Sequence, residues 1–268
     1  MNSIKPKYRR PLNDKQLYLL KLIYKFRFVT IPLISASQGK PETSVIHDRL
    51  ERLRQLRYIG RNYDGTYRLQ NKPANYFLLG AGIRVLSEHT SLSPKVLHST
   101  YGDKAASEQF TMRNLALFAV YNHLRSNYGT NLQYFAKSEL VSPDYDYFPQ
   151  PLPDAYIRLK NQAGAKEFFL NYVETTRPFF ATTSKLKKYI EYAENATWSE
   201  NSELPTILIV CEVLALERRL HKQLPRLPGV GELEILTTTK DRLKSSSKGD
   251  EIWYMASEPD VLLSLGSL

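Results

Sequence analysis

The first quarter of the chain combines a succession of short helical patterns with the whole of its net positive charge. Residues 1–72 contain 16 lysines and arginines against 5 aspartates and glutamates, a net charge of +11, whereas residues 73–268 hold 21 basic and 22 acidic side chains. A basic segment that is also patterned to fold is typical of proteins that bind a phosphate backbone. We therefore expect a small basic module at the N-terminus and a nearly neutral remainder.

Apolar residues in this quarter recur at helical spacing in three successive runs. Asn13 or Asp14 is placed to cap the first helix. Thr30 is placed to cap a short second helix that ends at Gly39. Pro41 suits the first turn of a third helix. The expected buried side of this third helix consists of Ile46, Leu50, Leu53 and Leu56.

The opposite side of the third helix is polar, and we predict that it contacts DNA. The candidate contact residues are Thr43, Ser44, His47, Arg52 and Arg54. Asp48 and Glu51 lie on the same side and would repel phosphate. They would therefore face cytosine edges, pair with Arg52 or Arg54, or mark a surface that does not read bases.

A β-hairpin is predicted to follow the third helix. Residues 61–63 and 67–70 have strand character, and the Asp64-Gly65 pair between them is a strong signal for a tight turn. Arg61 and Arg68 on this ribbon would contact phosphates or a minor groove. Residues 76–86 then fit a strand and a closing helix.

These patterns together predict a winged helix-turn-helix domain over residues 1–90 that binds double-stranded DNA and needs no cofactor to do so. An N-terminal arm would follow the DNA backbone with Lys5, Lys7, Arg9 and Arg10. A polar linker with Pro94 and Gly102 is expected over residues 91–104. Arginines on an amphipathic helix can also simply solvate its outer face, which is the alternative for this segment.

Residues 105–268 have the pattern of a second, mixed α+β or α/β domain. The expected elements are a helix at 105–124, strands at 132–140, 154–159 and 167–175, a helix at 184–195, a strand at 206–213 and a helix at 215–224. This order, with Pro153-Asp154 opening one strand and Glu174 ending the next, resembles the PD-(D/E)XK restriction-endonuclease core. The resemblance implies a restriction-endonuclease-like mixed sheet.

The same resemblance implies a candidate metal site. Asp154 and Glu174 would hold Mg²⁺, because hard cations prefer carboxylate oxygens, and Glu139 matches an additional acid. Thr176 occupies the place of the usual lysine. For this reason we favour a scaffold without activity over a Mg²⁺-dependent endonuclease or nickase.

Two other lysines could replace the one that is missing at position 176. Lys185 and Lys188 are three residues apart and share one side of the following helix. In the endonuclease alternative, one of them would support the attacking water.

Over nearly its full length the chain is similar to the replication-relaxation family. The similarity rests on the N-terminal pattern and on Leu78-Leu-Gly-Ala-Gly82, the helix around Asn114, Ser138-Glu139, Pro153-Asp154-Ala155, the strand 168–174, Lys185-Leu-Lys-Lys-Tyr189 and Pro205-Thr-Ile-Leu-Ile-Val210. It implies a plasmid, phage or other mobile-element protein that acts in replication, transfer or their regulation, and replication or transfer proteins as partners. Family members usually have an acid-x-acid pair followed by Gly-Thr where this chain has Glu174-Thr-Thr.

The remaining observations narrow the classes of protein. No apolar run is long enough to span a membrane and the N-terminus lacks a signal-peptide pattern, so we expect a cytoplasmic protein. The single cysteine, Cys211, lies in an apolar run and is expected to be buried. A homodimer assembled through the second domain would set the distance between two DNA half-sites. A basic module that binds an acidic protein partner is the third hypothesis.

Overall fold

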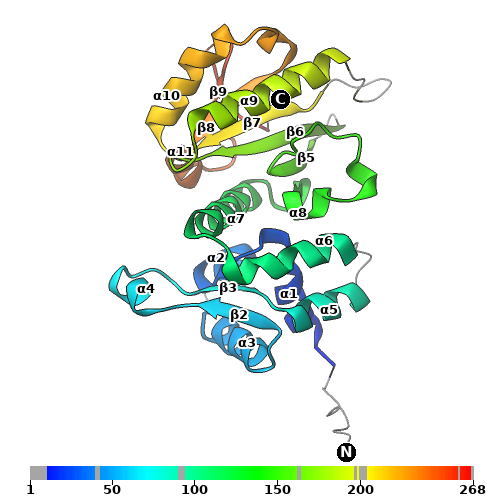
Figure 1. Ribbon diagram of the computed structural model, residues 1–268. Coiled ribbons are helices and arrows are strands. Elements are labelled where there is room, and N and C mark those ends of the chain that lie inside the picture. Colours follow the sequence, from blue (N-terminus) through cyan, green and yellow to red (C-terminus); the bar gives the residue numbers. More distant parts are fainter. Residues whose placement is uncertain are drawn as a thin grey trace, which may run out of the picture.

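The computed structural model describes residues 11–39, 43–89, 94–161, 164–195, 198, 204–258 and 260–266. It has a mixed α+β architecture with a small three-stranded sheet and a large seven-stranded mixed sheet. The two sheets lie toward opposite ends of the molecule, with α7 (Glu108–Tyr128) and α8 (Lys137–Leu140) between them (Figure 1). The residues predicted to form the N-terminal arm, at positions 5, 7, 9 and 10, lie outside the described residues.

Among the described residues, the smaller part is built from five helices and the small sheet. Its elements are α1 (Asp14–Phe26), β1 (Val29–Thr30), α2 (Ile31–Gln38), α3 (Thr43–Gln55), β2 (Ile59–Asn62), α4 (Gly65–Leu69), β3 (Asn75–Leu78) and α5 (Gly80–His89). The strands lie in the order β1-β3-β2 and all pairs are antiparallel.

Local capping interactions place the starts of α1 and α2 and the end of α2 where they were predicted, whereas Pro41, predicted in the first turn of the third helix, lies outside the described residues. The side chain of Asn13 accepts the N–H of Gln16, and the side chain of Gln16 accepts the N–H of Asn13, which is a capping box. Thr30 Oγ1 accepts the N–H of Leu33 at 3.4 Å, and Gly39 ends α2 with a left-handed φ of 62°. The predicted buried side of α3 is confirmed at Ile46, Leu50 and Leu53, and Leu56 is half-buried.

The predicted tight hairpin is wrong. Asp64 does not form a two-residue turn but caps α4, because its side chain accepts the N–H of Tyr67 at 3.1 Å. Arg68 therefore lies on a helix, and Arg61 is paired in β2 opposite Tyr76 of β3. An aspartate followed by glycine satisfies both a turn and a helix N-cap, and the next residues form the helix.

The larger part contains the seven-stranded sheet and the helices on its two faces. Its elements are α7, η2 (Gly129–Asn131), β4 (Leu132–Ala136), α8, η3 (Pro143–Tyr145), β5 (Ala155–Asn161), β6 (Gly164–Val173), α9 (Phe179–Asn195), β7 (Thr206–Cys211), α10 (Leu214–Gln223), η4 (Leu224–Arg226), η5 (Val230–Glu232), β8 (Ile235–Thr239), α11 (Lys240–Ser245), β9 (Trp253–Met255) and β10 (Leu262–Leu263). Between the two parts of the chain, α6 (Pro94–Ser99) and η1 (Thr100–Ala105) lie against α5 and β3 of the smaller part (Figure 1). The strand order is β10-β9-β8-β7-β6-β5-β4.

Both faces of this sheet are covered, which explains its apolar central strands. β6, β7 and β8 are parallel, and the outer strand pairs are antiparallel. Leu208 and Val210 of β7 pack in the same cluster as residues of α7 and α11. Ile207 and Ile209 pack on the other face with residues of α9 and α10. A parallel strand that is buried on both faces is apolar without alternation.

The predicted order of helix, three strands, helix and strand is present as α7, β4, β5, β6, α9 and β7. The first strand is shorter than predicted, because Glu139 accepts the N–H of Ala136 at 2.8 Å and the chain turns into α8. The segment predicted as a linker contains α6 and η1 in its described part. Cys211 is buried as expected. None of the described helices is long and apolar enough to cross a membrane.

Candidate functional site

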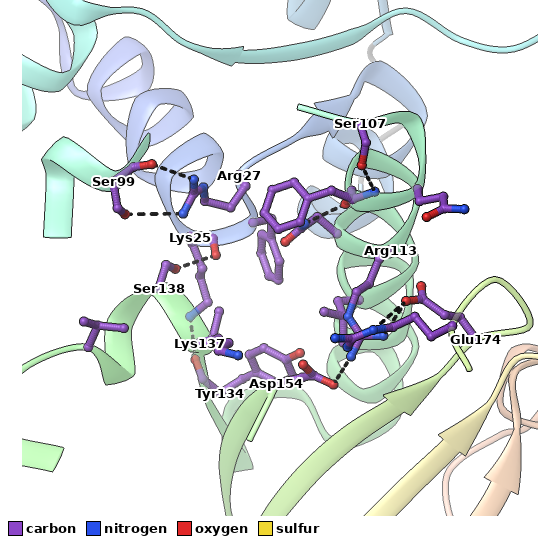
Figure 2. A pocket seen from close by; sticks show the side chains of 18 residues that line it. Lys25, Arg27, Ser99, Ser107, Arg113, Tyr134, Lys137, Ser138, Asp154 and Glu174 are labelled. Atoms are coloured by element: carbon purple, nitrogen blue, oxygen red, sulfur yellow. Dashed lines mark hydrogen bonds and ion pairs between the residues drawn. The ribbon is translucent and has the colours of Figure 1, made fainter. Parts of the chain in front are cut away.

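A cluster of buried charge lies where β5 and β6 meet α7. Arg113 of α7 donates to Asp154 at 2.6 Å, and its other terminal nitrogen lies 3.1 Å from Glu174. Asp154 directly precedes β5 and Glu174 directly follows β6, so two neighbouring strands bring the carboxylates together. Figure 2 shows Arg113 reaching between the two acids. All three side chains are almost completely removed from solvent.

The surroundings of Asp154 stabilise its ionised form. Burial on its own would raise the pKa of Asp154, but Lys185, Arg113 and the N–H of Tyr172 lower it to about 2. The N–H of Tyr172 donates to the carboxylate at 2.8 Å. Asp154 is therefore charged at any physiological pH.

Burial is the largest cause of the pKa shifts of Glu174 and Lys185. Burial raises the pKa of Glu174, against the opposite effect of Arg113 and Arg177. Burial lowers the pKa of Lys185 to about 8, against the opposite effect of Asp154. The Lys185 ammonium donates to the backbone oxygen of Leu152 at 2.8 Å, which holds it beside the cluster.

A cleft of about 440 Å³ opens beside this cluster, between α1, α7, α8 and the strand ends. Figure 2 shows Lys25, Arg27 and Ser138 on one side of the cleft, and Arg113, Asp154 and Glu174 on the other. Arg27 is engaged by the buried Asp103, and Lys25 by Glu139 at 2.9 Å.

Three of the residues predicted to form a nuclease site come together. Asp154, Glu174 and Lys185 line one small cavity with Arg113. Glu139 pairs with Lys25, and Lys188 is exposed and pairs with Glu191 at 2.8 Å. Neither Glu139 nor Lys188 lines the cleft or this cavity. Among the described residues, no group of three or more histidines, cysteines, aspartates or glutamates could hold a metal ion.

Arg113 was missed in the sequence, although one signal was available. It follows Phe110 by three residues and precedes Leu117 by four, so it lies on the apolar side of its helix. A cation there needs a buried counter-charge. The sequence does not say which of the chain's acids provides it, since Asp154 and Glu174 are 41 and 61 residues away. Lys137 and Arg177 also line the cleft, but the sequence contains no comparable signal for them.

The predicted DNA-contact side of α3 is exposed. The exposed candidate residues are Thr43, Ser44, His47, Arg52 and Arg54, and Arg61 and Arg68 are exposed on β2 and α4. The two acids on α3 have local partners: Glu51 binds Arg54 at 2.6 Å, and Asp48 lies 3.4 Å from His47.

Only some of the N-terminal cations are paired with acids from the rest of the chain. Lys25, Arg27 and Lys72 pair with Glu139, Asp103 and Glu108, respectively. The arginines of α3 and β2 have no ion pair to an acid beyond residue 72 among the described residues. The basic surface of α3 therefore stays open.

Known proteins are similar to this chain at the level of a family and, more distantly, of structure. The replication-relaxation family matches residues 20–207. No curated protein matches the chain. The restriction endonuclease FokI bound to DNA has a TM-score of 0.33 and 13% identity over 88% of this chain and 45% of that one. A second FokI structure has a TM-score of 0.32 and 11% identity over 85% and 43%. The chain spans less than half the length of FokI, and similarity at this level carries no conclusion about function.

Proposed function

The chain belongs to the replication-relaxation family, and we propose that it is a double-stranded DNA-binding protein of a plasmid, phage or other mobile element. It would act in replication, in transfer or in their regulation. The observation that supports this proposal is the open basic surface on α3, on which Arg52 is exposed and its guanidinium has no hydrogen bond or ion pair among the described residues.

The arrangement of helices and strands in the smaller part supports the proposal that it is a winged helix. α2 and α3 would form the helix-turn-helix, and α3 would enter the major groove. β2, α4 and β3 would form the wing, which carries Arg61 on its strand and Arg68 on its helix. The exposed arginines would contact phosphates and fix the orientation of α3.

Charge reversal on α3 tests the proposed DNA surface. The variant Arg52→Glu/Arg54→Glu changes the net charge by the same amount as Arg218→Glu/Lys222→Glu on the exposed side of α10. We expect the α3 variant to abolish duplex binding in an electrophoretic shift assay, and the α10 variant to retain it. Equal affinity of the wild type and the α3 variant would refute the placement of DNA on α3.

We propose that the larger part is a nuclease-like scaffold that does not bind a catalytic metal ion. Its order α7, β4, β5, β6, α9 and β7, with antiparallel β4 to β6 and parallel β6 and β7, is the order expected for a PD-(D/E)XK core. Mg²⁺ does not fit the residues present, because Arg113 binds both Asp154 and Glu174, and its charge repels a cation. We therefore propose that this part contributes to binding and assembly rather than to hydrolysis.

Incubation of supercoiled plasmid with the protein and Mg²⁺ or Mn²⁺ tests this second point. We expect no nicking above that of a buffer control. Nicking that disappears in the variant Asp154→Ala would establish the endonuclease alternative instead.

Two further parts of the proposal concern partners. A homodimer assembled through the larger part would set the spacing of two half-sites, and light scattering of the full chain measures its mass.

Binding to an acidic protein surface is the competing function for the basic module. Efficient competition by a defined duplex and weak competition by heparin would favour DNA over a generic polyanion.

A further inference from the structure

The cleft beside α1 adjoins a smaller cavity, and five charged side chains line both. The cleft has a volume of about 440 Å³ and the smaller cavity about 140 Å³. The shared charged residues are Arg113, Lys137, Asp154, Glu174 and Arg177, and Lys185 lines the smaller cavity in addition. These residues come from α7, α8, the ends of β5 and β6, the loop between β6 and α9, and α9 itself.

The charges in this place do not balance. Four cations, Arg113, Lys137, Arg177 and Lys185, face two anions, Asp154 and Glu174. Arg113 already binds both carboxylates, at 2.6 Å and 3.1 Å. The six groups together therefore leave a net charge of +2 at the boundary of the two cavities.

Two of these four cations are exposed and can contact a ligand. Lys137 is exposed, and its ammonium has no hydrogen bond or ion pair among the described residues. Arg177 is exposed and lies 3.8 Å from Glu174, which Arg113 holds more closely. Figure 2 shows Lys137 beside Asp154 at the cleft. Lys185, by contrast, is held by the backbone oxygen of Leu152.

We propose that the cleft is a phosphate-binding site, in which Lys137 and Arg177 contact the phosphate. An excess of positive charge in a partly enclosed place attracts an anion and repels a divalent cation. Lysine and arginine are the residues that bind phosphate oxygens by charge-assisted hydrogen bonds. Asp154 and Glu174 then act as positioning residues, because they hold Arg113 in the wall of the cleft.

A calorimetric titration of the full chain with inorganic phosphate, at constant ionic strength, tests the proposal. We expect saturable binding to the wild type that is at least about 10-fold weaker in Lys137→Ala/Arg177→Ala, since each lost contact is a charged hydrogen bond. The matched control, Lys187→Ala/Arg218→Ala, removes one exposed lysine and one exposed arginine outside the cleft. Equal binding by both double variants, or no saturable binding by the wild type, would overturn the proposal.

Magnesium provides the opposite arm of the same experiment. We expect Mg²⁺ to give no saturable binding to the wild type. Saturable Mg²⁺ binding that is lost in Asp154→Asn would contradict the charge argument and overturn the proposed phosphate site.

The phosphate could belong to a nucleic acid strand, to the end of a strand or to a free compound. Short single-stranded oligonucleotides with and without a 5′-phosphate distinguish these sources. Equal binding that needs Lys137 and Arg177 identifies a backbone phosphate, and binding of only the phosphorylated strand identifies a strand end. Binding of inorganic phosphate alone identifies a free compound. The α3 variants keep every residue that lines the cleft, so a failure of the duplex-binding proposal can be distinguished from a failure of the phosphate site.

Discussion

At the scale of the residue, one arginine that was not singled out in the sequence binds two acids that were. Asp154 and Glu174 were correctly identified in the sequence as strand-end carboxylates, and they do come together. Their chemistry was not predictable, because it depends on Arg113, which binds both. The guanidinium of Arg113 and the ammonium of Lys185 together balance the two negative charges of these carboxylates.

The charge of Asp154 predicts a specific dependence of stability on pH. Its pKa in the folded protein is about 2 against an ordinary value of 3.8, so its stabilising effect is fully present above pH 3.8 and is lost as the pH falls toward 2. The variant Asp154→Asn should lower the free energy of unfolding by about 2 kcal/mol at pH 6, with a difference that shrinks below pH 4. Urea unfolding at several pH values measures this.

The exposed Asp146 provides the control for this prediction, because its side chain has no hydrogen bond or ion pair in the described part of the chain. The variant Asp146→Asn should leave stability nearly unchanged at every pH. A difference between Asp154→Asn and the wild type that stays constant down to pH 2 would show that the ionised carboxylate is not the source of the effect.

At the scale of the element, features fixed by local hydrogen bonds were predictable and features fixed by packing were not. The caps at Asn13 and Thr30 and the end at Gly39 are encoded within a few residues. Asp64 was ambiguous, because its side chain caps α4 instead of forming a turn. The elements from α11 to β10 are too short for their sequence pattern to predict them. The strand β8, which precedes them, is stabilised by its pairing with β7, a partner that is distant along the chain.

The packing of α5 gives a prediction about one glycine. A Cβ atom added at Gly82 would lie 2.4 Å from the backbone oxygen of Tyr58, which cannot move aside as a side chain could. The variant Gly82→Ala should therefore lower the free energy of unfolding by about 1–3 kcal/mol. Gly231→Ala, where nothing lies within 4 Å, is the matched control and should have little effect. Similar melting temperatures for both variants would contradict the close packing of α5 on Tyr58.

At the scale of the whole molecule, the two parts are joined by a shared apolar core and by ion pairs. One cluster of buried residues includes Leu20 of α1, Phe118 of α7 and Phe168 of β6. The ion pairs at this junction use Lys25 of α1, Arg27 directly after it and Lys72 before β3. Arg52 and Arg54 of α3 and Arg61 of β2 remain exposed. The net charge of the first quarter was readable in the sequence, but its division between junction and surface was not, because the partners are distant along the chain.

The salt dependence of duplex affinity tests the central claim, that exposed arginines of α3 bind the phosphate backbone. Each phosphate contact changes the slope of log affinity against log salt by about one unit. The account predicts a steep slope for the wild type, a slope shallower by about two for Arg52→Ala/Arg54→Ala, and an unchanged slope for Arg218→Ala/Lys222→Ala. Identical slopes for the wild type and the α3 variant would contradict it.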